Sequence, residues 1–179
     1  MALKPTIYKF RIALSDLDRN YYDQLDLTVA MHPSETTERM ITRVLAFCLN
    51  AQERLTFSTG LSNPELPDIF VKSRDDQPEL WIDVGEPAAD RVRKATHSSP
   101  YVKIYCFNSK SDVWWSKERK KLAKLNIEVI QFDWLEIRAL SENIQRTMDF
   151  SVSISDARAF ISMENNQLDI GWLVLQESN

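Results

Sequence analysis

Apolar segments of strand length alternate with segments of helical period through the middle of the chain, and this alternation restricts the fold most strongly. The strand-like segments are "DIFVK", "LWIDVG", "YVKIYCF" and "IEVIQF". Helical patterns lie between the later ones, from about Ala88 to Thr96 and over "DVWWSKERKKLAKL". A strand, a helix of roughly a dozen residues and a second strand fit a right-handed βαβ crossover. The sequence therefore predicts an α/β fold.

Both ends of the chain add strand patterns to this central region. The N-terminal part contains "TIYKFRIAL", the turn "SDLDRN" and the strand "DLTVAM". The C-terminal part contains "MDFSVSISD", "AFISME" and "LDIGWLVLQE", with a turn through "NNQ". We predict a mixed sheet flanked by helices, with additional antiparallel strands from both termini. All residues, 1–179, are assigned to a single domain of ordinary size.

The segment "HPSETTERMITRVLAFCLNAQERL" has the clearest helical period in the chain. Pro33 and Ser34 are a suitable helix start. The apolar positions recur at helical spacing: Ile41, Val44, Leu45, Cys48 and Leu55. The polar side is expected to carry Arg39, Arg43, Asn50 and Arg54. A shorter helix is predicted over "DWLEIRALSENI", with Leu135 and Ala139 one turn apart.

Composition excludes several classes of protein. The net charge of −4 argues against a protein that relies on non-specific affinity for nucleic acid, because that affinity needs clustered Lys and Arg. The three glycines are widely spaced, so neither a P-loop nor a GxGxxG nucleotide loop is present. No segment resembles a signal peptide or a membrane span. Cys48 and Cys106 lie in apolar runs, as buried free thiols do in a reducing compartment, and we expect a soluble, cytoplasmic protein with no membrane partner.

Hydrolase chemistry based on histidine or cysteine is also disfavoured. His32 and His97 are the only histidines, and neither has the spacing of a metal-ligand set. Neither cysteine stands in a nucleophile motif, and no G-x-S-x-G elbow occurs.

Three carboxylates occupy positions where carboxylates are costly. Glu38 is expected in the first turn of the long helix, on the face shared with Ile41 and Leu45. Asp68 opens a strand, and Asp83 lies within one, although Asp is a poor strand former. Each has a structural alternative: Glu38 as a residue favoured by the helix dipole, Asp68 as a turn residue, and Asp83 as a solvated position.

The two central strands can be paired by placing a turn at the two aspartates of "SRDDQP". This register puts Lys72 opposite Glu79, a favourable cross-strand pair, and Asp68 opposite Asp83. Like charges directly opposed in a sheet are destabilising. A divalent cation between the two carboxylates, or a raised pKa on one of them, would relieve the repulsion.

Several longer motifs resemble the YaeQ family of small bacterial proteins. They are "HPSETTERM", "LWIDVGEPAADRVRKA", the "WW" at Trp114 and Trp115, and "QRTMDFSV", which occur in the family's order. The resemblance covers essentially the whole chain. It implies a fold that varies the PD-(D/E)XK nuclease architecture, and hence a restriction-endonuclease-like mixed sheet.

The resemblance also implies a metal site for Mg²⁺ or Mn²⁺. Pro67 and Asp68 are similar to the "PD" of that pattern, Asp83 to its second acid, and Glu38 to the helix glutamate that often joins them. This sequence departs from the nuclease pattern at Gly85, because the pattern has a lysine two residues after the second acid.

Basic residues elsewhere are candidates to replace that lysine. Arg91 and Lys94 match the "RxxK" stretch of the YaeQ pattern and lie three residues apart on one helix face. Lys72 and Lys103 are weaker candidates. With Glu38, Asp68 and Asp83 as metal ligands, Arg91 or Lys94 would stabilise the charge that develops on a phosphodiester.

Two classes of function follow from these residues. The first is a metal-dependent nuclease-like protein that acts on phosphodiester bonds of DNA or RNA. The alternative is a non-catalytic module on the same fold, which binds nucleic acid through "RVRK" and "KERKKLAK" or acts as a protein-binding regulatory factor. The adjacent Trp114 and Trp115 cannot both face the core, so one is a candidate for contact with a protein partner or a second copy.

Overall fold

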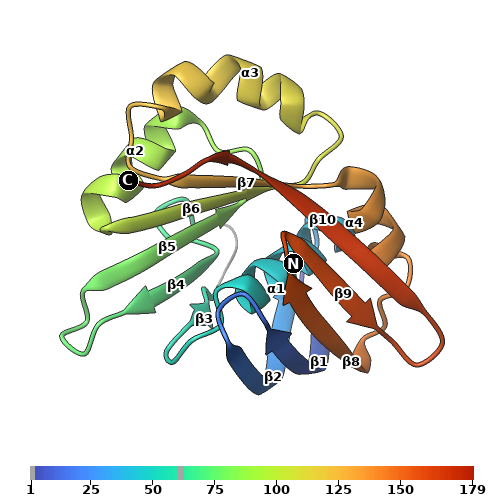
Figure 1. Ribbon diagram of the computed structural model, residues 1–179. Coiled ribbons are helices and arrows are strands. Elements are labelled where there is room, and N and C mark those ends of the chain that lie inside the picture. Colours follow the sequence, from blue (N-terminus) through green and yellow to red (C-terminus); the bar gives the residue numbers. More distant parts are fainter. Residues whose placement is uncertain (1–2, 60–62) are drawn as a thin grey trace. The chain divides into compact units, whose positions relative to one another are not determined.

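The computed structural model of the chain describes residues 3–59 and 63–179 (Figure 1). These residues form two compact units that each contain strands and helices. The first unit consists of the residues up to Leu49 together with Asp133–Trp172, and the second of Asn50–Phe132 together with Leu173–Asn179. The chain therefore has a mixed α/β fold, as predicted. The assignment of residues 1–179 to one domain stays a prediction.

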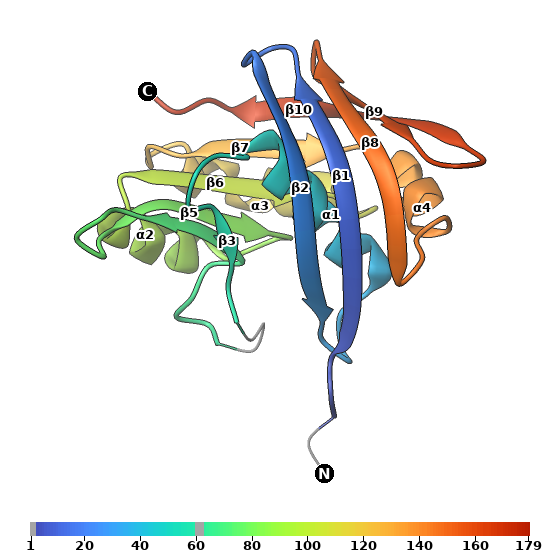
Figure 2. The ribbon, with the colours of Figure 1, turned by 90° about the horizontal axis from the view of Figure 1, so that it is seen from below.

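The first unit contains the additional strands from both ends of the chain. Its elements are β1 (Thr6–Asp16), β2 (Tyr21–Met31), α1 (Thr37–Leu49), α4 (Trp134–Ser141), β8 (Thr147–Ser155), β9 (Arg158–Ser162) and the first part of β10 (Gln167–Gln176). Strand β1 pairs antiparallel with β2 and parallel with β8, so these three long strands lie side by side (Figure 2). Strands β8, β9 and β10 are antiparallel. The predicted antiparallel strands from both termini are confirmed.

The second unit contains the central α/β pattern. Its elements are β3 (Thr56–Phe57), β4 (Ile69–Lys72), β5 (Pro78–Val84), α2 (Ala89–Ser98), β6 (Tyr101–Cys106), α3 (Ser111–Leu122), β7 (Glu128–Phe132) and the end of β10. Strands β5, β6 and β7 are parallel neighbours, joined by α2 and α3. The predicted βαβ connections are confirmed. Strand β3 was not predicted, because two residues are too short to show a period.

Helices α2 and α3 lie over one face of the sheet in the second unit (Figure 1). Their apolar residues share one core with strands β6 and β7. That core includes Val92 and Ala95 of α2, Trp114 and Leu122 of α3, Ile104 of β6 and Val129 of β7. Trp114 is buried and donates its indole N–H to the carbonyl of Pro87 at 3.0 Å. Trp115 is only partly buried, so of the adjacent pair it is the one with an accessible surface.

Helix α1 is shorter at both ends than the sequence pattern suggested. It begins at Thr37, because the Thr36 hydroxyl accepts the backbone N–H of Arg39 at 3.2 Å and caps the helix there. It ends at Leu49, and Leu55 lies outside the helix. Arg54 has a φ of 71°, which a helix cannot accommodate. The other predicted apolar positions of this helix are buried, as expected.

The prediction that Arg43 lies on a polar face is wrong. Its side chain is 2% exposed and forms an ion pair with Glu35 at 2.7 Å. In helix α4, Leu135 is 69% exposed, and the residues that face the core are Ile137 and Leu140. Cys48 and Cys106 are buried free thiols, as predicted. Over residues 3–59 and 63–179, no helix combines the length and apolar character needed to cross a bilayer.

Candidate functional site

Asp68 and Asp83 come together where β4 and β5 meet. The predicted register holds in β4 and β5, where Ile69 pairs with Ile82 and Phe70 with Trp81. Just before β4, Asp68 donates its backbone N–H to the Ile82 carbonyl at 3.0 Å. Its carboxylate accepts the backbone N–H of Val84 at 2.7 Å. Asp68 therefore contacts the residues on either side of Asp83.

One pairing of this hairpin was predicted incorrectly. Lys72 lies opposite Pro78 and not opposite Glu79, because a β-bulge between Val71 and Lys72 shifts the register near the turn. The Lys72 ammonium instead forms an ion pair with Asp76 at 3.1 Å. The bulge leaves the register at the other end of the hairpin unchanged.

Arg91 of α2 connects Asp83 to the segment that leads into β4. Its Nε donates to Asp83 Oδ2 at 2.9 Å, and its Nη2 donates to Asp83 Oδ1 at 3.1 Å. Nη1 donates to the carbonyl of Pro64, and Nη2 also donates to the carbonyl of Leu66 at 2.9 Å. The guanidinium group therefore holds both oxygens of Asp83 in the bidentate geometry that arginine forms with carboxylates. It also fixes the backbone that precedes Pro67.

Burial changes the acid–base properties of this pair. The pKa of the Asp83 carboxyl is raised from its ordinary value, chiefly by burial, against the hydrogen bond and charge of Arg91, and the charge of Asp68 raises it further. The pKa of Arg91 is also raised, chiefly by its hydrogen bond to Asp83. Both shifts favour the protonated form, but the shift of Arg91 assumes an ionised Asp83, whereas the shift of Asp83 favours its neutral form. Burial decides the direction for Asp83, because its side chain is 5% exposed, whereas that of Arg91 is 30% exposed.

Two buried polar atoms next to these acids have no hydrogen-bond partner within the chain. Among the described residues they are the hydroxyl of Ser58 and the indole N–H of Trp81. Ser58 follows β3 and donates its backbone N–H to the Asp68 carbonyl at 3.0 Å. Trp81 precedes Asp83 by two residues on the same strand face. Its N–H is near enough to lower the pKa of Asp83 slightly, but it forms no hydrogen bond of normal geometry.

The Trp81 ring also lies against Arg91. The guanidinium carbon is 5.8 Å from the ring centroid, within the range of a cation–π interaction. Most buried polar atoms in folded proteins are hydrogen-bonded, and an unpaired one often marks a place where a water or ligand binds. The two unpartnered groups, the two carboxylates and Arg91 together form the candidate site of the second unit.

A family model described as YaeQ protein matches residues 1–172. The chain belongs to the YaeQ family. It is 38% identical to the uncharacterized protein YaeQ of Salmonella typhi over 172 residues, which are 95% of each chain. It is 35% identical to YaeQ of Escherichia coli (strain K12) over 179 residues, which are 99% of each chain.

Solved structures of YaeQ proteins have the same fold. The crystal structure of YaeQ from Xanthomonas axonopodis pv. citri superposes with a TM-score of 0.93 and 36% identity, over 97% of this chain and 99% of that one. YaeQ from Pseudomonas syringae superposes with a TM-score of 0.92 and 32% identity, over 97% of each chain. The names of these YaeQ proteins state no activity.

The other predicted site residues lie in different surroundings. Lys94 is exposed on α2, and its side chain has no role in the Asp83–Arg91 pair. Lys103 lies 3.7 Å from Glu128. Glu38 is partly buried in the first turn of α1, in the first unit, and its inclusion among the metal ligands stays a prediction. Over the described residues, no group of three or more His, Cys, Asp or Glu side chains is arranged to hold a metal ion.

Gly85 has a backbone conformation that explains why lysine is absent there. Its φ is +121°, a value that residues with a Cβ rarely adopt, although a Cβ at this position would contact nothing within 4 Å. The backbone N–H of Gly85 donates to the Tyr105 carbonyl at 2.8 Å and continues the sheet. Strain in the backbone, and not lack of space, therefore disfavours lysine two residues after Asp83.

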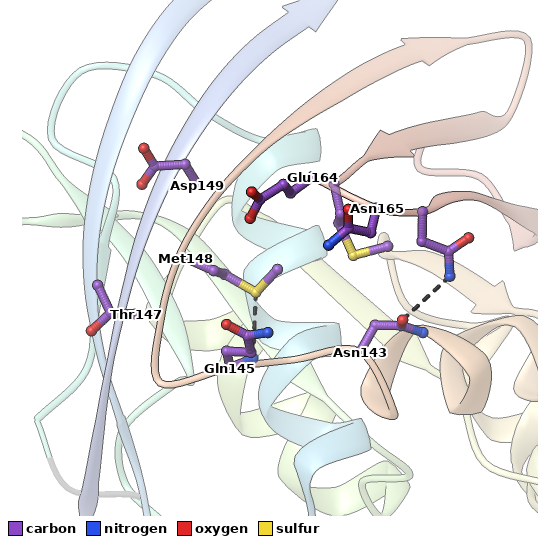
Figure 3. Close-up of a pocket in the computed structure, with 9 residues that line it drawn as sticks. Asn143, Gln145, Thr147, Met148, Asp149, Glu164 and Asn165 are labelled. Atoms are coloured by element: carbon purple, nitrogen blue, oxygen red, sulfur yellow. Dashed lines mark hydrogen bonds between the residues drawn. The ribbon is translucent and has the colours of Figure 1, made fainter.

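A separate polar hollow of about 650 Å³ lies in the first unit (Figure 3). Its lining includes Asn143, Gln145, Asp149 and Glu164 (Figure 3). Asn143 accepts a hydrogen bond from the Asn166 amide at 3.2 Å. No Lys, Arg or His is among its lining residues in the described chain. Its carboxylates would repel a phosphate, so this hollow does not suit a phosphodiester.

Ser58, Trp81 and the buried Glu35 were missed from the sequence. Strand alternation puts Trp81 on the same face as Asp83, but nothing in the sequence pattern shows that its N–H lacks a partner. Glu35 belongs to the "HPSE" motif, and its position one helical repeat before Arg39 and two before Arg43 is a usable signal for their ion pairs.

Proposed function

We propose that this protein is a metal-dependent, nuclease-like protein that acts on phosphodiester bonds of nucleic acid, on a fold resembling the PD-(D/E)XK nucleases. One observation carries the proposal. Two carboxylates, a guanidinium group and two unpartnered polar atoms lie together at the β4–β5 end, all in the second unit. Pro67-Asp68 and Asp83 correspond to the two acids of the nuclease pattern. Glu38 belongs to the first unit, and its role as a third acid stays a prediction from the sequence.

The donor set at this place fits a small divalent cation. Mg²⁺ retains several water ligands and is held in many enzymes by only one or two carboxylates together with substrate phosphates. Asp68 and Asp83 would supply those carboxylates. The pKa of Asp83 is raised chiefly by burial and further by the charge of Asp68, and a cation would relieve that repulsion. When bound, such an ion lowers the pKa of an attacking water and neutralises charge on the phosphate.

Arg91 takes the place of the lysine in this proposal. Its guanidinium group already lies against Asp83, and arginine recognises phosphate oxygens through the same bidentate geometry. Binding of a cation to Asp83 would free the Nε and Nη2 groups of Arg91 for a phosphate. The bonds from Arg91 to the carbonyls of Pro64 and Leu66 keep the group at the site.

One observation favours the alternative of a non-catalytic binding module. Arg91 already satisfies both oxygens of Asp83, so the carboxylate has a cationic partner without any metal. A divalent ion must compete with that pair. In this alternative the Asp83–Arg91 pair is structural, and nucleic acid or a protein partner is bound elsewhere on the chain.

Metal binding and cleavage measured together distinguish these functions. Titration with Mn²⁺ by calorimetry, and incubation with labelled single-stranded and duplex DNA and RNA, should show binding and cleavage for the unaltered chain. Asp83→Asn should abolish both. Asp75→Asn is the matched control, because the same change is made in the exposed turn of the same hairpin.

Two results of these measurements would count against the nuclease proposal. Mn²⁺ binding with no cleavage of any substrate would favour the binding module. No Mn²⁺ binding by the unaltered chain, or equal binding by the Asp83→Asn variant, would contradict a metal site at the acid pair.

A further inference from the structure

The C-terminal half of α3 carries an unusual concentration of cations. They are Lys117, Arg119, Lys120, Lys121 and, just after the helix, Lys124. All five are exposed, and none forms an ion pair with a carboxylate in the described part of the chain. The acidic residue among them, Glu118, is used elsewhere, because its carboxylate accepts the backbone N–H of Ala89 at 3.2 Å.

Helix stability alone does not account for these cations. Basic residues near a helix C-terminus are favoured by the helix dipole. However, Lys117 and Lys121 lie one turn apart, as do Lys120 and Lys124, and like charges at this spacing destabilise a helix. In a chain of net charge −4, this end of α3 is a local exception that suits an anionic ligand.

The same end of α3 borders a hollow of about 560 Å³ in the second unit. Trp115, Arg119 and Lys120 of α3 line it, together with Leu125 and Leu175. The volume is in the range of small-ligand sites. Trp115 packs against the core with part of its surface and leaves the rest available at the hollow.

Hydrogen bonds fix the shape of this hollow. The Gln176 side-chain amide donates to the carbonyls of Leu122 and Leu125, at 3.0 Å each. The backbone N–H of Asn179 donates to the Asn126 side chain at 2.7 Å. These bonds attach the end of β10 to the end of α3 and to the segment after it, so this part of the wall is held in place before any ligand binds.

We propose that this hollow binds single-stranded nucleic acid, with one base stacked on Trp115 and the adjoining phosphates contacted by Arg119 and Lys120. An aromatic face beside unpaired cations is the arrangement with which proteins bind single strands without sequence preference. A duplex fits less well, because its bases are stacked on each other and offer no free face. Glu177 also lines the hollow, and its carboxylate would repel a phosphate, so the phosphates are assigned to Arg119 and Lys120.

This site does not depend on the metal site proposed above. It uses different residues, and its ligand contacts need no divalent ion. Binding to the hollow is therefore expected in the presence of a chelator, whereas the metal binding and cleavage proposed above are not. Failure of one proposal is thus distinguishable from failure of the other.

Fluorescence anisotropy of a labelled oligothymidylate, at low salt and with EDTA, tests the proposal. Trp115→Leu should weaken binding roughly fivefold to a hundredfold, which corresponds to the loss of one stacked base. Lys120→Gln should weaken it less and should reduce the dependence of affinity on salt. Lys110→Gln is the matched control, because it removes the same charge from the other end of the same helix.

Competition decides the class of ligand. Unlabelled single strand should displace the probe at much lower concentration than a duplex of the same sequence or polyglutamate. Equal displacement by polyglutamate, equal binding by the Lys110→Gln and Lys120→Gln variants, or no binding by the unaltered chain would overturn the proposal. Because Lys120 is exposed, its replacement keeps the test valid even where Trp115→Leu impairs folding.

Discussion

Each compact unit contains an arginine paired with a carboxylate that is shielded from solvent, and the two pairs differ in how completely their hydrogen-bonding groups are satisfied. In the first unit, Glu35 and Arg43 are each 2% exposed. One oxygen of Glu35 accepts from Arg43 and the other accepts from Arg39 at 3.0 Å. Arg43 also donates to the carbonyl of Ala30 at 2.9 Å. The carboxylate thus has a cationic partner on each oxygen.

In the second unit, the Asp83–Arg91 pair is next to a second acid and two unpartnered polar atoms. Asp68 adds negative charge, and the pKa of Asp83 is raised. Burial and pairing are therefore not by themselves signs of a functional site, because the Glu35 pair has both. The distinguishing feature is hydrogen-bonding capacity that the chain leaves unused.

The largest effect is expected from a substitution that breaks the Glu35–Arg43 pair. Glu35→Ala leaves the buried Arg43 without its carboxylate, which should lower the free energy of unfolding by roughly 3–5 kcal/mol, as measured by urea denaturation. Mn²⁺ should not restore this loss. The control Glu53→Ala, at an exposed turn position, should change stability by about 0.5 kcal/mol or less. A loss for Glu35→Ala as small as that of the control would contradict the role given to this pair.

A smaller effect is expected from Arg91→Met, about 2 kcal/mol near pH 7, because Arg91 is partly exposed. The pKa of Asp83 lies above its ordinary value of 3.8, so the folded chain holds this proton more tightly than the unfolded chain. That contribution to stability is present at low pH and is lost as the pH rises through the folded pKa. Without Arg91 the pKa rises further.

The deficit of Arg91→Met should therefore shrink as the pH is lowered from neutral into the acidic range, because Asp83 of the folded variant takes up its proton at a higher pH than Asp83 of the unaltered chain. Urea denaturation across this range measures the change. Arg93→Met, which removes an exposed arginine from the same helix, is the control and should show a small deficit that does not vary with pH. A deficit for Arg91→Met that grows on acidification would contradict the raised pKa.

The smallest effect, and the sharpest contrast between the units, is expected from Trp81→Phe. Removing a buried donor that has no partner offsets the packing that the smaller ring loses, so the stability of the ligand-free chain should change by no more than about 1 kcal/mol. The stabilisation of the chain by Mn²⁺ should fall, because the N–H would no longer assist at the acid pair. Thermal unfolding with and without Mn²⁺ measures both. Lower stability without the ion, with an unchanged response to it, would indicate a purely structural tryptophan.

The sequence predicted the parts of the site that depend on local rules. The hairpin register followed from strand alternation and a turn, which placed Asp68 beside Asp83, and the helix after Gly85 brought Arg91 within reach. The Lys72–Glu79 pair was wrong because a single bulge shifts the register, and alternation does not show bulges.

The remaining features depend on packing, which a sequence pattern does not contain. Arg43 was assigned to a polar face because a charged residue is ordinarily exposed, yet its partner Glu35 makes burial tolerable. The unpartnered atoms of Ser58 and Trp81 are defined by what surrounds them. The burial of a side chain and the lack of a hydrogen-bond partner can be established only from the three-dimensional positions of the surrounding residues.

Anomalous scattering from a crystal soaked in Mn²⁺ tests the central claim most directly. A peak within ligand distance of the Asp68 and Asp83 carboxylates, absent from the Asp83→Asn variant, is the predicted result. Arg91 should then have released at least one oxygen of Asp83. A crystal with no peak there, in which Arg91 still holds both oxygens of Asp83, would contradict the account and make this pair as structural as that of Glu35 and Arg43.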